Sequence, residues 1–164
     1  MKKHLQKGIT AVVAACLFLA PLSGVWAEVA YIERSYTVGE ALKAESFLDE
    51  NRNPVLSEKG YAQRQLEYNA KGQISRESYF GVDGKPMALA GGQAAVARTY
   101  DEKGNVSLET YFGVDGKPVL FEGKYAGRGR AYNEKKKVIR ESYFGVDGKP
   151  IALEDGRASI ARVY

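Results

Sequence analysis

A seven-residue strand pattern recurs five times along the chain. Each copy starts with alanine, ends with tyrosine and carries arginine or an aliphatic residue at positions between them. Alternation with a period of two is typical of a β-strand with one packed face. We therefore predict strands of a first type at residues 30–36, 62–68, 94–100, 126–132 and 158–164.

A second type of strand follows each of the first four. In residues 74–80, one face carries isoleucine, arginine, serine and phenylalanine, and the other carries Glu77 and Tyr79. This β-branched and aromatic content favours a pleated sheet. Equivalent strands are predicted at residues 106–112 and 138–144. The earliest copy, within residues 38–48, contains a Glu-Ala-Leu-Lys-Ala-Glu run that could form a helix on propensity alone. Its alignment with the later strands favours β-structure.

Short turns separate the two strand types. Residues 69–73 and 101–105 each start with asparagine or aspartate and carry glycine at the fourth position. An Asx residue starts a turn and glycine accepts a positive φ, so these segments predict type I turns with a glycine bulge between antiparallel strands. In the next copy Lys136 replaces the glycine, and this turn is therefore expected to be looser or strained.

The strands belong to a repeat of 32 residues. Pro54, Pro86, Pro118 and Pro150 follow this period, and three of the four end a Tyr-Phe-Gly-Val-Asp-Gly-Lys-Pro motif. A fixed period of this length is typical of repeat arrays, and local hairpins favour a meander over a Greek key. We predict an all-β antiparallel hairpin array, meander-like or solenoid-like, of 4 to 5 units that begin near residues 30, 62, 94, 126 and 158.

The chain opens on a segment of different composition. Three lysines precede an apolar run at residues 9–22, and the small residues of Val25-Trp26-Ala27 suit a cleavage site. This order is typical of a secretory signal peptide. We predict residues 1–27 to be a signal peptide cleaved after Ala27, and residues 28–164 to be a single repeat domain exported to the periplasm or beyond the cell. Two alternatives stay open, which are a retained N-terminal anchor and lipidation of Cys16 in a lipobox-like Val-Ala-Ala-Cys.

The composition of the remaining chain limits its chemistry. Removing residues 1–27 removes the only histidine, His4, and the only cysteine, Cys16, and leaves 21 basic against 20 acidic residues. A balance so close to neutrality gives no argument for a nucleic-acid partner. The commonest general base, the thiol nucleophile and the usual zinc ligands are missing. We therefore predict no enzyme activity, no cofactor and no metal, and we interpret the single aspartates of the Asp-Gly turns as turn formers rather than calcium ligands.

Residues 100–105, Tyr-Asp-Glu-Lys-Gly-Asn, resemble the Tyr-Asp-x-x-Gly core of the YD repeats of RHS-type bacterial secreted proteins. Residues 68–72 are a softened form, and Tyr132 and Asn133 keep only its start. The period of 32 is longer than a typical YD unit, and 137 residues are too few for the hollow shell of that family. The resemblance implies β-hairpin repeats and a bacterial secreted setting, and it does not imply a toxin-enclosing role.

The glutamate and the tyrosine that recur in strands of the second type are the candidate binding residues. Stacked units would place the tyrosines in a row with the glutamates beside them, and Glu109 is expected on an exposed face. Tyrosine rings can stack on sugar rings, because both present flat apolar faces. The other interpretation is structural, since cross-strand tyrosine pairs fix the register of a sheet. The candidate residues are Tyr79, Tyr111, Tyr143, Glu77, Glu109 and Glu141.

These patterns favour a secreted or cell-envelope repeat protein with a non-catalytic structural or protein-interaction role. The alternative is a glycan-binding or cell-wall-binding module that uses the tyrosine row. The last strand, at residues 158–164, has no second-type partner after it in the sequence and resembles the first, at residues 30–36. Unpaired strands expose backbone donors and acceptors, so weak self-association through the edge strands is also expected, with fraying of the ends as the alternative.

Overall fold

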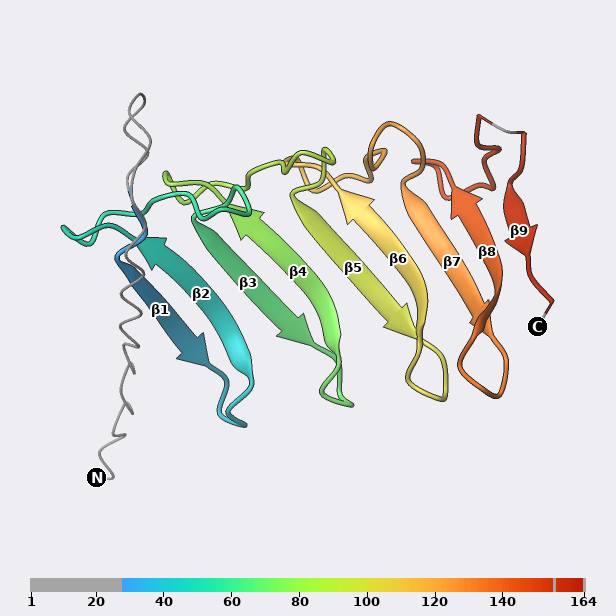
Figure 1. Ribbon diagram of the computed structural model, residues 1–164, viewed down its shortest axis with the longest axis horizontal. Coiled ribbons are helices and arrows are strands. Elements are labelled where there is room, and N and C mark those ends of the chain that lie inside the picture. The colour runs from blue at the N-terminus through green and yellow to red at the C-terminus, as the bar shows by residue number, and fades with distance from the viewer. Residues whose placement is uncertain (1–27, 155, 164) are drawn as a thin grey trace.

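Nine antiparallel strands form one sheet in the computed structural model, which describes residues 28–154 and 156–163. The strands lie side by side in sequence order (Figure 1). The predicted all-β hairpin array is therefore confirmed, whereas the predicted signal peptide and Cys16 lie outside the described residues. The strands are β1 (Tyr31–Tyr36), β2 (Leu42–Leu48), β3 (Gln63–Tyr68), β4 (Ile74–Phe80), β5 (Ala95–Tyr100), β6 (Val106–Phe112), β7 (Gly127–Tyr132), β8 (Val138–Phe144) and β9 (Ser159–Ala161).

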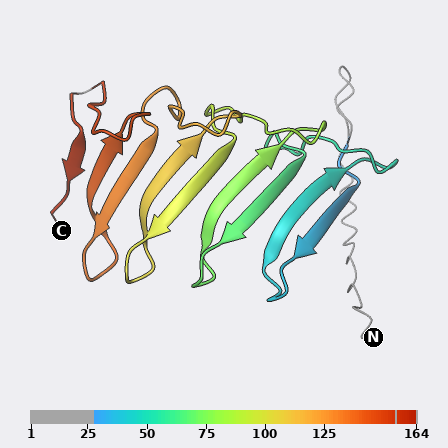
Figure 2. The same ribbon diagram turned by 180° about the vertical axis from the view of Figure 1, so that it is seen from behind.

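Two kinds of connection join the strands, and they lie at opposite ends of the sheet. Tight turns close each hairpin at the lower end in Figure 1, and longer connections lead to the next hairpin at the upper end, as the reverse view in Figure 2 also shows. The segment that allowed a helix on propensity forms β2, so the β-interpretation is correct. Within the described residues, no helix is long and apolar enough to cross a membrane.

The tight turns follow the predicted chemistry. In the second hairpin, Asn69 N–H donates to the Gln73 carbonyl at 2.9 Å, and Gly72 has a φ of 74°. The third hairpin has the same kind of turn, with Asp101 N–H donating to the Asn105 carbonyl at 2.9 Å and Gly104 at a φ of 81°. The fourth places Lys136 at a φ of 58°. Its closing bonds, 3.0 Å from Lys136 N–H to Asn133 and 3.0 Å from Asn133 N–H to Lys137, are retained. The turn is thus not looser, and the positive φ of a lysine carries the expected strain.

The two faces of the sheet differ in what covers them. Residues directly opposite in an antiparallel pair share a face, and Glu77 lies opposite Leu66 on β3 and Val96 on β5. This side, which also carries Tyr79, is called the packed face. The other side, which carries Phe80, is called the open face. Less is buried on that side, where Leu48 and Ala95 are 8 % and 4 % exposed, whereas the aromatic core cluster includes Tyr79 of the packed face.

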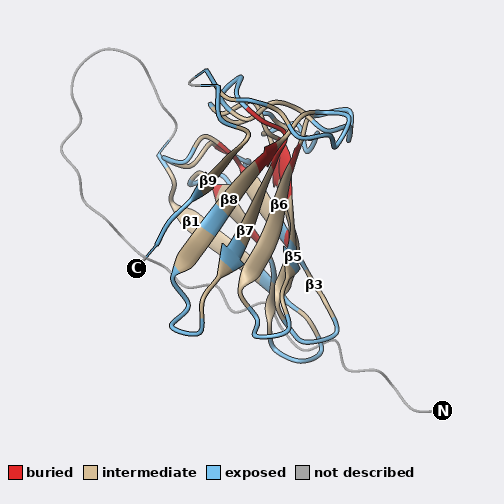
Figure 3. Ribbon diagram, turned by 90° about the vertical axis from the view of Figure 1, so that its right-hand side faces the viewer, coloured by how far each residue is buried: buried red, intermediate tan, exposed pale blue. Residues whose placement is uncertain are grey.

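The longer connections fold back over the upper part of the packed face. Their apolar residues contact a cluster of buried tyrosines and Val96, so this layer of side chains forms the core, as the burial colours in Figure 3 show near the connections. Within the part of the chain that the structure describes, sheet and connections thus share one core without a second sheet. The partly buried residues packed on this cluster are Phe47, Leu89, Val119, Phe121, Ile151, Leu153 and Ile160.

Tyrosines at the lower end of the first-type strands join each hairpin to the one before it. The Tyr68 hydroxyl donates to the Leu42 carbonyl at 2.7 Å, and the Tyr132 hydroxyl donates to the Val106 carbonyl at 2.9 Å. Each bond spans 26 residues of sequence. Because neutral hydrogen bonds add about 1 kcal/mol each, the period-32 tyrosines stabilise the stacking of hairpins as well as each hairpin itself.

Candidate interaction surface

The predicted carboxylates lie in a continuous row of ion pairs that crosses the packed face. Glu77 accepts from Arg64 at 3.1 Å and from Arg98 at 3.2 Å, so one carboxylate joins the arginines of two neighbouring hairpins. Even-numbered strands supply glutamate, and β1, β3, β5 and β7 supply arginine, while Arg162 directly follows the last residue of β9. The members of this ion-pair row are Arg34, Glu45, Arg64, Glu77, Arg98, Glu109, Arg128, Arg130, Glu141 and Arg162.

Arginine changes position within the unit without leaving the row. In β3 it is Arg64, with Leu66 two residues later, whereas β5 has Val96 first and Arg98 second. Both positions lie on the packed face because side chains alternate along a strand. A long side chain reaches a diagonal neighbour across a sheet, and each arginine therefore contacts Glu77 from either position.

The prediction that Glu109 lies on an exposed face is wrong. Its side chain is only 12 % exposed and contacts Arg98 at 3.3 Å and Arg128 at 2.7 Å. Burial alone would raise the pKa of the Glu109 carboxyl, but Arg128, Arg130 and Arg98 outweigh that effect and hold its pKa below the ordinary value. The carboxylate is thus charged and occupied by partners within the fold.

The predicted tyrosines lie in the row next to the carboxylates but are covered. Tyr79, Tyr111 and Tyr143 are 9 %, 5 % and 7 % exposed. The Tyr111 ring stacks on Phe121 of the following connection, with ring centroids 4.5 Å apart. Burial raises the pKa of the Tyr111 hydroxyl to about 12, and the Glu109 carboxylate adds to this rise. These rings therefore do not present faces to solvent, and the register places Tyr79 opposite Arg64 and Tyr111 opposite Val96 rather than opposite another tyrosine.

The Gly-Val-Asp-Gly-Lys-Pro motifs form three identical turns in a row along the upper end of the sheet. In the first, the Asp83 carboxylate accepts the Lys85 backbone N–H at 3.0 Å, and the other two turns repeat this bond at the same distance. The aspartates therefore act as turn formers. Among the described residues, no group of three His, Cys, Asp or Glu residues is arranged to hold a metal ion.

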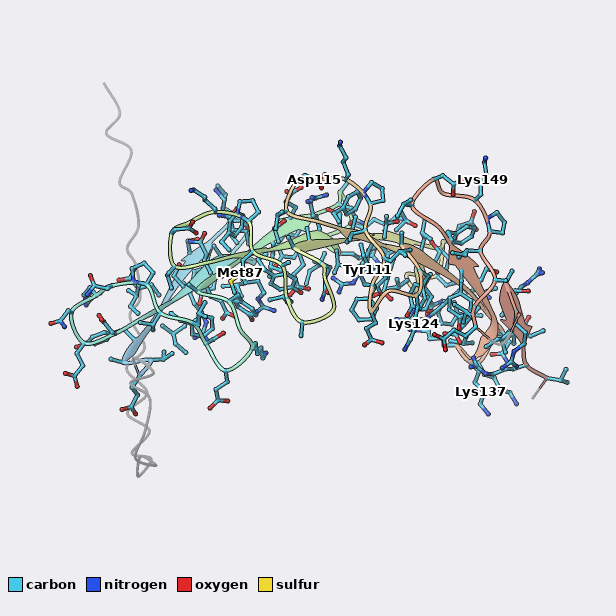
Figure 4. The ribbon with its side chains drawn as sticks, turned by 90° about the horizontal axis from the view of Figure 1, so that it is seen from above. Met87, Tyr111, Asp115, Lys124, Lys137 and Lys149 are labelled. Atoms are coloured by element: carbon cyan, nitrogen blue, oxygen red, sulfur yellow. The ribbon has the colours of Figure 1, made fainter. Side chains whose placement is uncertain are left out.

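The side chains of these turns point outward in every copy. Val82, Val114 and Val146 are 52 %, 55 % and 54 % exposed, and the lysine side chains of the first and third turns are 81 % and 82 % exposed. Figure 4, seen from above, places Asp115 and Lys149 on one side of the sheet and Lys124 on the other. We call this set of turns the turn row. It comprises residues 81–86, 113–118 and 145–150.

The first unit closes the same turn with other residues. Asp49-Glu-Asn-Arg-Asn53 occupies the equivalent place, with Asp49 N–H donating to the Asn53 carbonyl at 2.9 Å and Arg52 N–H donating to the Asp49 carbonyl at 3.1 Å. The corresponding bonds of the second unit, from Gly81 and Gly84, measure 2.9 Å and 3.1 Å. The backbone geometry therefore does not require the valine and lysine that the other three units share.

The open face borders the turn row. Phenylalanine ends each of β4, β6 and β8 there, and the strands between them carry only small residues on this face near those rings. Gly129 permits close approach, because a Cβ at this position would lie 3.2 Å from Cε2 of Phe144. The ring of Phe144, together with Leu108, Pro118 and Val146, lines a shallow depression of about 170 Å³. The partly buried ring of Phe144 thus adjoins the second and third turns of the turn row, through Pro118 and Val146.

No family model matches this chain, and no curated protein matches it. Among the six residues predicted from sequence, the structure brings the carboxylates into the ion-pair row and the tyrosines into the core. The turn row was recognised from sequence only as a structural motif. Its signal was present in the contrast between residues 81–86 and residues 49–54.

Proposed function

We propose that this protein is an exported, non-catalytic repeat scaffold that binds a protein partner at the cell envelope through the turn row. The observation that carries the proposal is the identity of three exposed turns whose backbone does not require that identity. Elsewhere the same units have diverged, as in the connections that read Ala-Gly-Gly-Gln at residues 90–93 and Glu-Gly-Lys-Tyr at residues 122–125. Shared residues at exposed positions are thus explained best by a shared contact.

Three copies of one contact also suit a partner that is itself repetitive. Neighbouring turns are held on one rigid sheet, so after the first turn binds, the second binds at a high effective concentration. Weak individual contacts of a valine and a lysine would add to a useful affinity in this way. A compact ligand that touches one turn would gain nothing from the repetition.

The test replaces the shared side chains with those that the first unit carries. Each valine becomes glutamate and each lysine becomes asparagine, as in Glu50 and Asn53, in all three turns of the full chain. Because the first unit closes its turn with these residues, we expect unchanged circular dichroism and loss of cross-linked protein adducts in the cells that produce the chain. The same adducts in the variant and in the unmodified chain would contradict the proposal.

Glycan binding is tested in the same preparation. Titration with soluble cell-wall fragments, read by intrinsic tyrosine fluorescence, should give no response if the partner is a protein. A saturable response would favour the glycan alternative. Self-association through the edge strands of the described sheet, β1 and β9, is tested by sedimentation of Ile160→Pro, since proline removes a backbone donor from β9.

Export is tested by mass spectrometry of the protein recovered from outside the cytoplasm. A mature start at Glu28 supports cleavage after Ala27. A diacylglyceryl group on Cys16 would replace that proposal with a lipid anchor, and an intact N-terminus would replace it with a retained segment.

A further inference from the structure

The fourth first-type strand carries one arginine more than its place in the ion-pair row requires. In β3 the two packed-face positions are Arg64 and Leu66, and in β5 they are Val96 and Arg98. β7 instead has arginine at both positions, Arg128 and Arg130. Strict alternation that starts and ends with arginine would give five arginines and four glutamates. The row contains six arginines and four glutamates, and the additional arginine lies on β7.

The contacts of the two arginines show which one is in surplus. Arg128 donates a 2.7 Å hydrogen bond to Glu109. Arg130 lies 3.5 Å from Glu109 and 3.5 Å from Glu141, which are both distances for loose ion pairs without a hydrogen bond. Those carboxylates already have closer partners, because Arg162 contacts Glu141 at 3.0 Å. The planar guanidinium of Arg130 is thus the least satisfied member of the row.

The surroundings of Arg130 make a surplus charge unfavourable unless an anion compensates it. The side chains of Arg130 and Arg128 are 22 % and 26 % exposed. A half-buried charge without a matching counter-charge costs free energy. Arginine offers two parallel N–H donors that fit the two oxygens of a carboxylate or phosphate.

We propose that β7 holds an oxyanion-binding site on the packed face, formed by Arg130 with Arg128 beside it. The ligand is a carboxylate or a tetrahedral oxyanion such as phosphate, either free or carried by a larger molecule. This site is separate from the turn row and does not depend on the partner proposed for it. Binding supplies the counter-charge that Glu109 and Glu141 provide only in part.

The test uses Arg130→Leu in the full chain, because leucine is what β3 carries at the equivalent position, Leu66. The unfolding temperature is followed against inorganic phosphate, sulfate and acetate, with sodium chloride added to keep the ionic strength constant. We expect the unfolding temperature of the unmodified chain to rise with anion concentration until it saturates. For Arg130→Leu we expect no rise larger than the one that chloride alone produces. Lys103→Leu removes the same charge from an exposed turn and should keep the full rise.

Each outcome bears on the proposal. A rise with phosphate and sulfate alone indicates a tetrahedral ligand, and a rise with acetate alone indicates a carboxylate, and both support the site. The proposal would be overturned if the unfolding temperature of the unmodified chain were the same in phosphate, sulfate, acetate and chloride. It would also be overturned if Lys103→Leu lost the rise in unfolding temperature to the same extent as Arg130→Leu. The reciprocal variant Leu66→Arg builds the same pair of arginines in β3 and should increase the number of phosphates bound, measured by equilibrium dialysis. An unchanged number in a folded Leu66→Arg protein would also overturn it.

Discussion

The hydroxyl of Tyr100 donates a 2.6 Å hydrogen bond to the backbone carbonyl of Ile74, which belongs to the preceding hairpin. Tyr100→Phe removes this bond and leaves the ring in place. We expect the free energy of unfolding to fall by about 1 kcal/mol, measured by urea denaturation. Tyr36→Phe is the matched control, since Tyr36 is 51 % exposed, and its effect should be smaller. Equal losses in the two variants would show that the bond to Ile74 adds nothing.

Glu109→Gln tests the ion-pair row at its best-connected carboxylate. The change removes the charge that Arg98 and Arg128 contact, and leaves both guanidinium groups half-buried. Loss of hydrogen bonds to a charged group costs about 2 kcal/mol, and we expect a decrease of that size in urea denaturation. Glu102→Gln, in an exposed turn, should change the stability by less than about 0.5 kcal/mol.

Acid should destabilise the fold through the same carboxylate. The pKa of Glu109 is lower in the folded chain than its ordinary value of 4.5. Its contribution is therefore fully present above about pH 4.5 and is lost as the pH falls through the lower, folded value. We expect the free energy of unfolding to fall over this range and to fall less steeply in Glu109→Gln. Some dependence of the free energy of unfolding on pH should remain in the variant, because hydrogen bonds from Asn105 also lower the pKa of the Asp101 carboxyl.

Alkali should act through the buried tyrosines. Burial raises the pKa of Tyr111 from 10.0 to about 12, and it raises the pKa of Tyr79 and Tyr143 as well. Stability from a raised pKa is present below the unfolded value of 10.0 and is lost as the pH rises through the folded one. We expect part of the phenolate absorbance to appear together with unfolding near pH 12. Complete ionisation of all tyrosines while the strand spectrum persists would contradict the described burial.

Lys136→Gly tests the strain in the fourth hairpin turn. Lysine at a φ of 58° costs about 1 kcal/mol relative to glycine. The variant should therefore be more stable by about this amount, measured as an increased denaturation midpoint with an unchanged slope. The reciprocal change Gly72→Lys places lysine at a φ of 74° where a Cβ meets no atom within 4 Å. It should lose a similar amount, and a gain would show that positive φ is not the cause.

Strand positions followed from the sequence because each strand is specified by its own residues. The predicted span of residues 74–80 coincides with β4, and the second and third tight turns carry Asx and glycine at the places that their geometry favours. The first and fourth tight turns have Glu40 and Lys136 at positive φ instead. The last strand is the exception, since among residues 158–163, the part of this prediction that the structure describes, only Ser159–Ala161 form a strand. Local patterns with strong chemistry are therefore read reliably in this chain.

The buried face of the second-type strands was assigned wrongly because burial depends on the connections. Alternate apolar residues, such as Val119 and Phe121 or Ile151 and Leu153, mark segments that cover the tyrosines. A second signal was the hairpin itself, because antiparallel pairing with a short turn places Glu77 opposite Leu66 on the packed face. The bonds from tyrosine hydroxyls to the preceding hairpin depend on how units stack, and no local pattern specifies them.

Contact between strands is confined to neighbours in the sequence, and this makes the length of the described sheet adjustable. Removing residues 94–125 would join Gln93 to Ala126 and bring β4 against β7 across a junction of the same kind as every other. The tyrosine bond, the ion pairs and the core contacts would all be formed again by equivalent residues. One such deletion also removes one turn of the turn row. Unit number therefore sets the number of turns in the turn row, and with it the valence and reach expected under the proposed function. Both would change by whole steps through gene duplication or loss without any redesign of the fold.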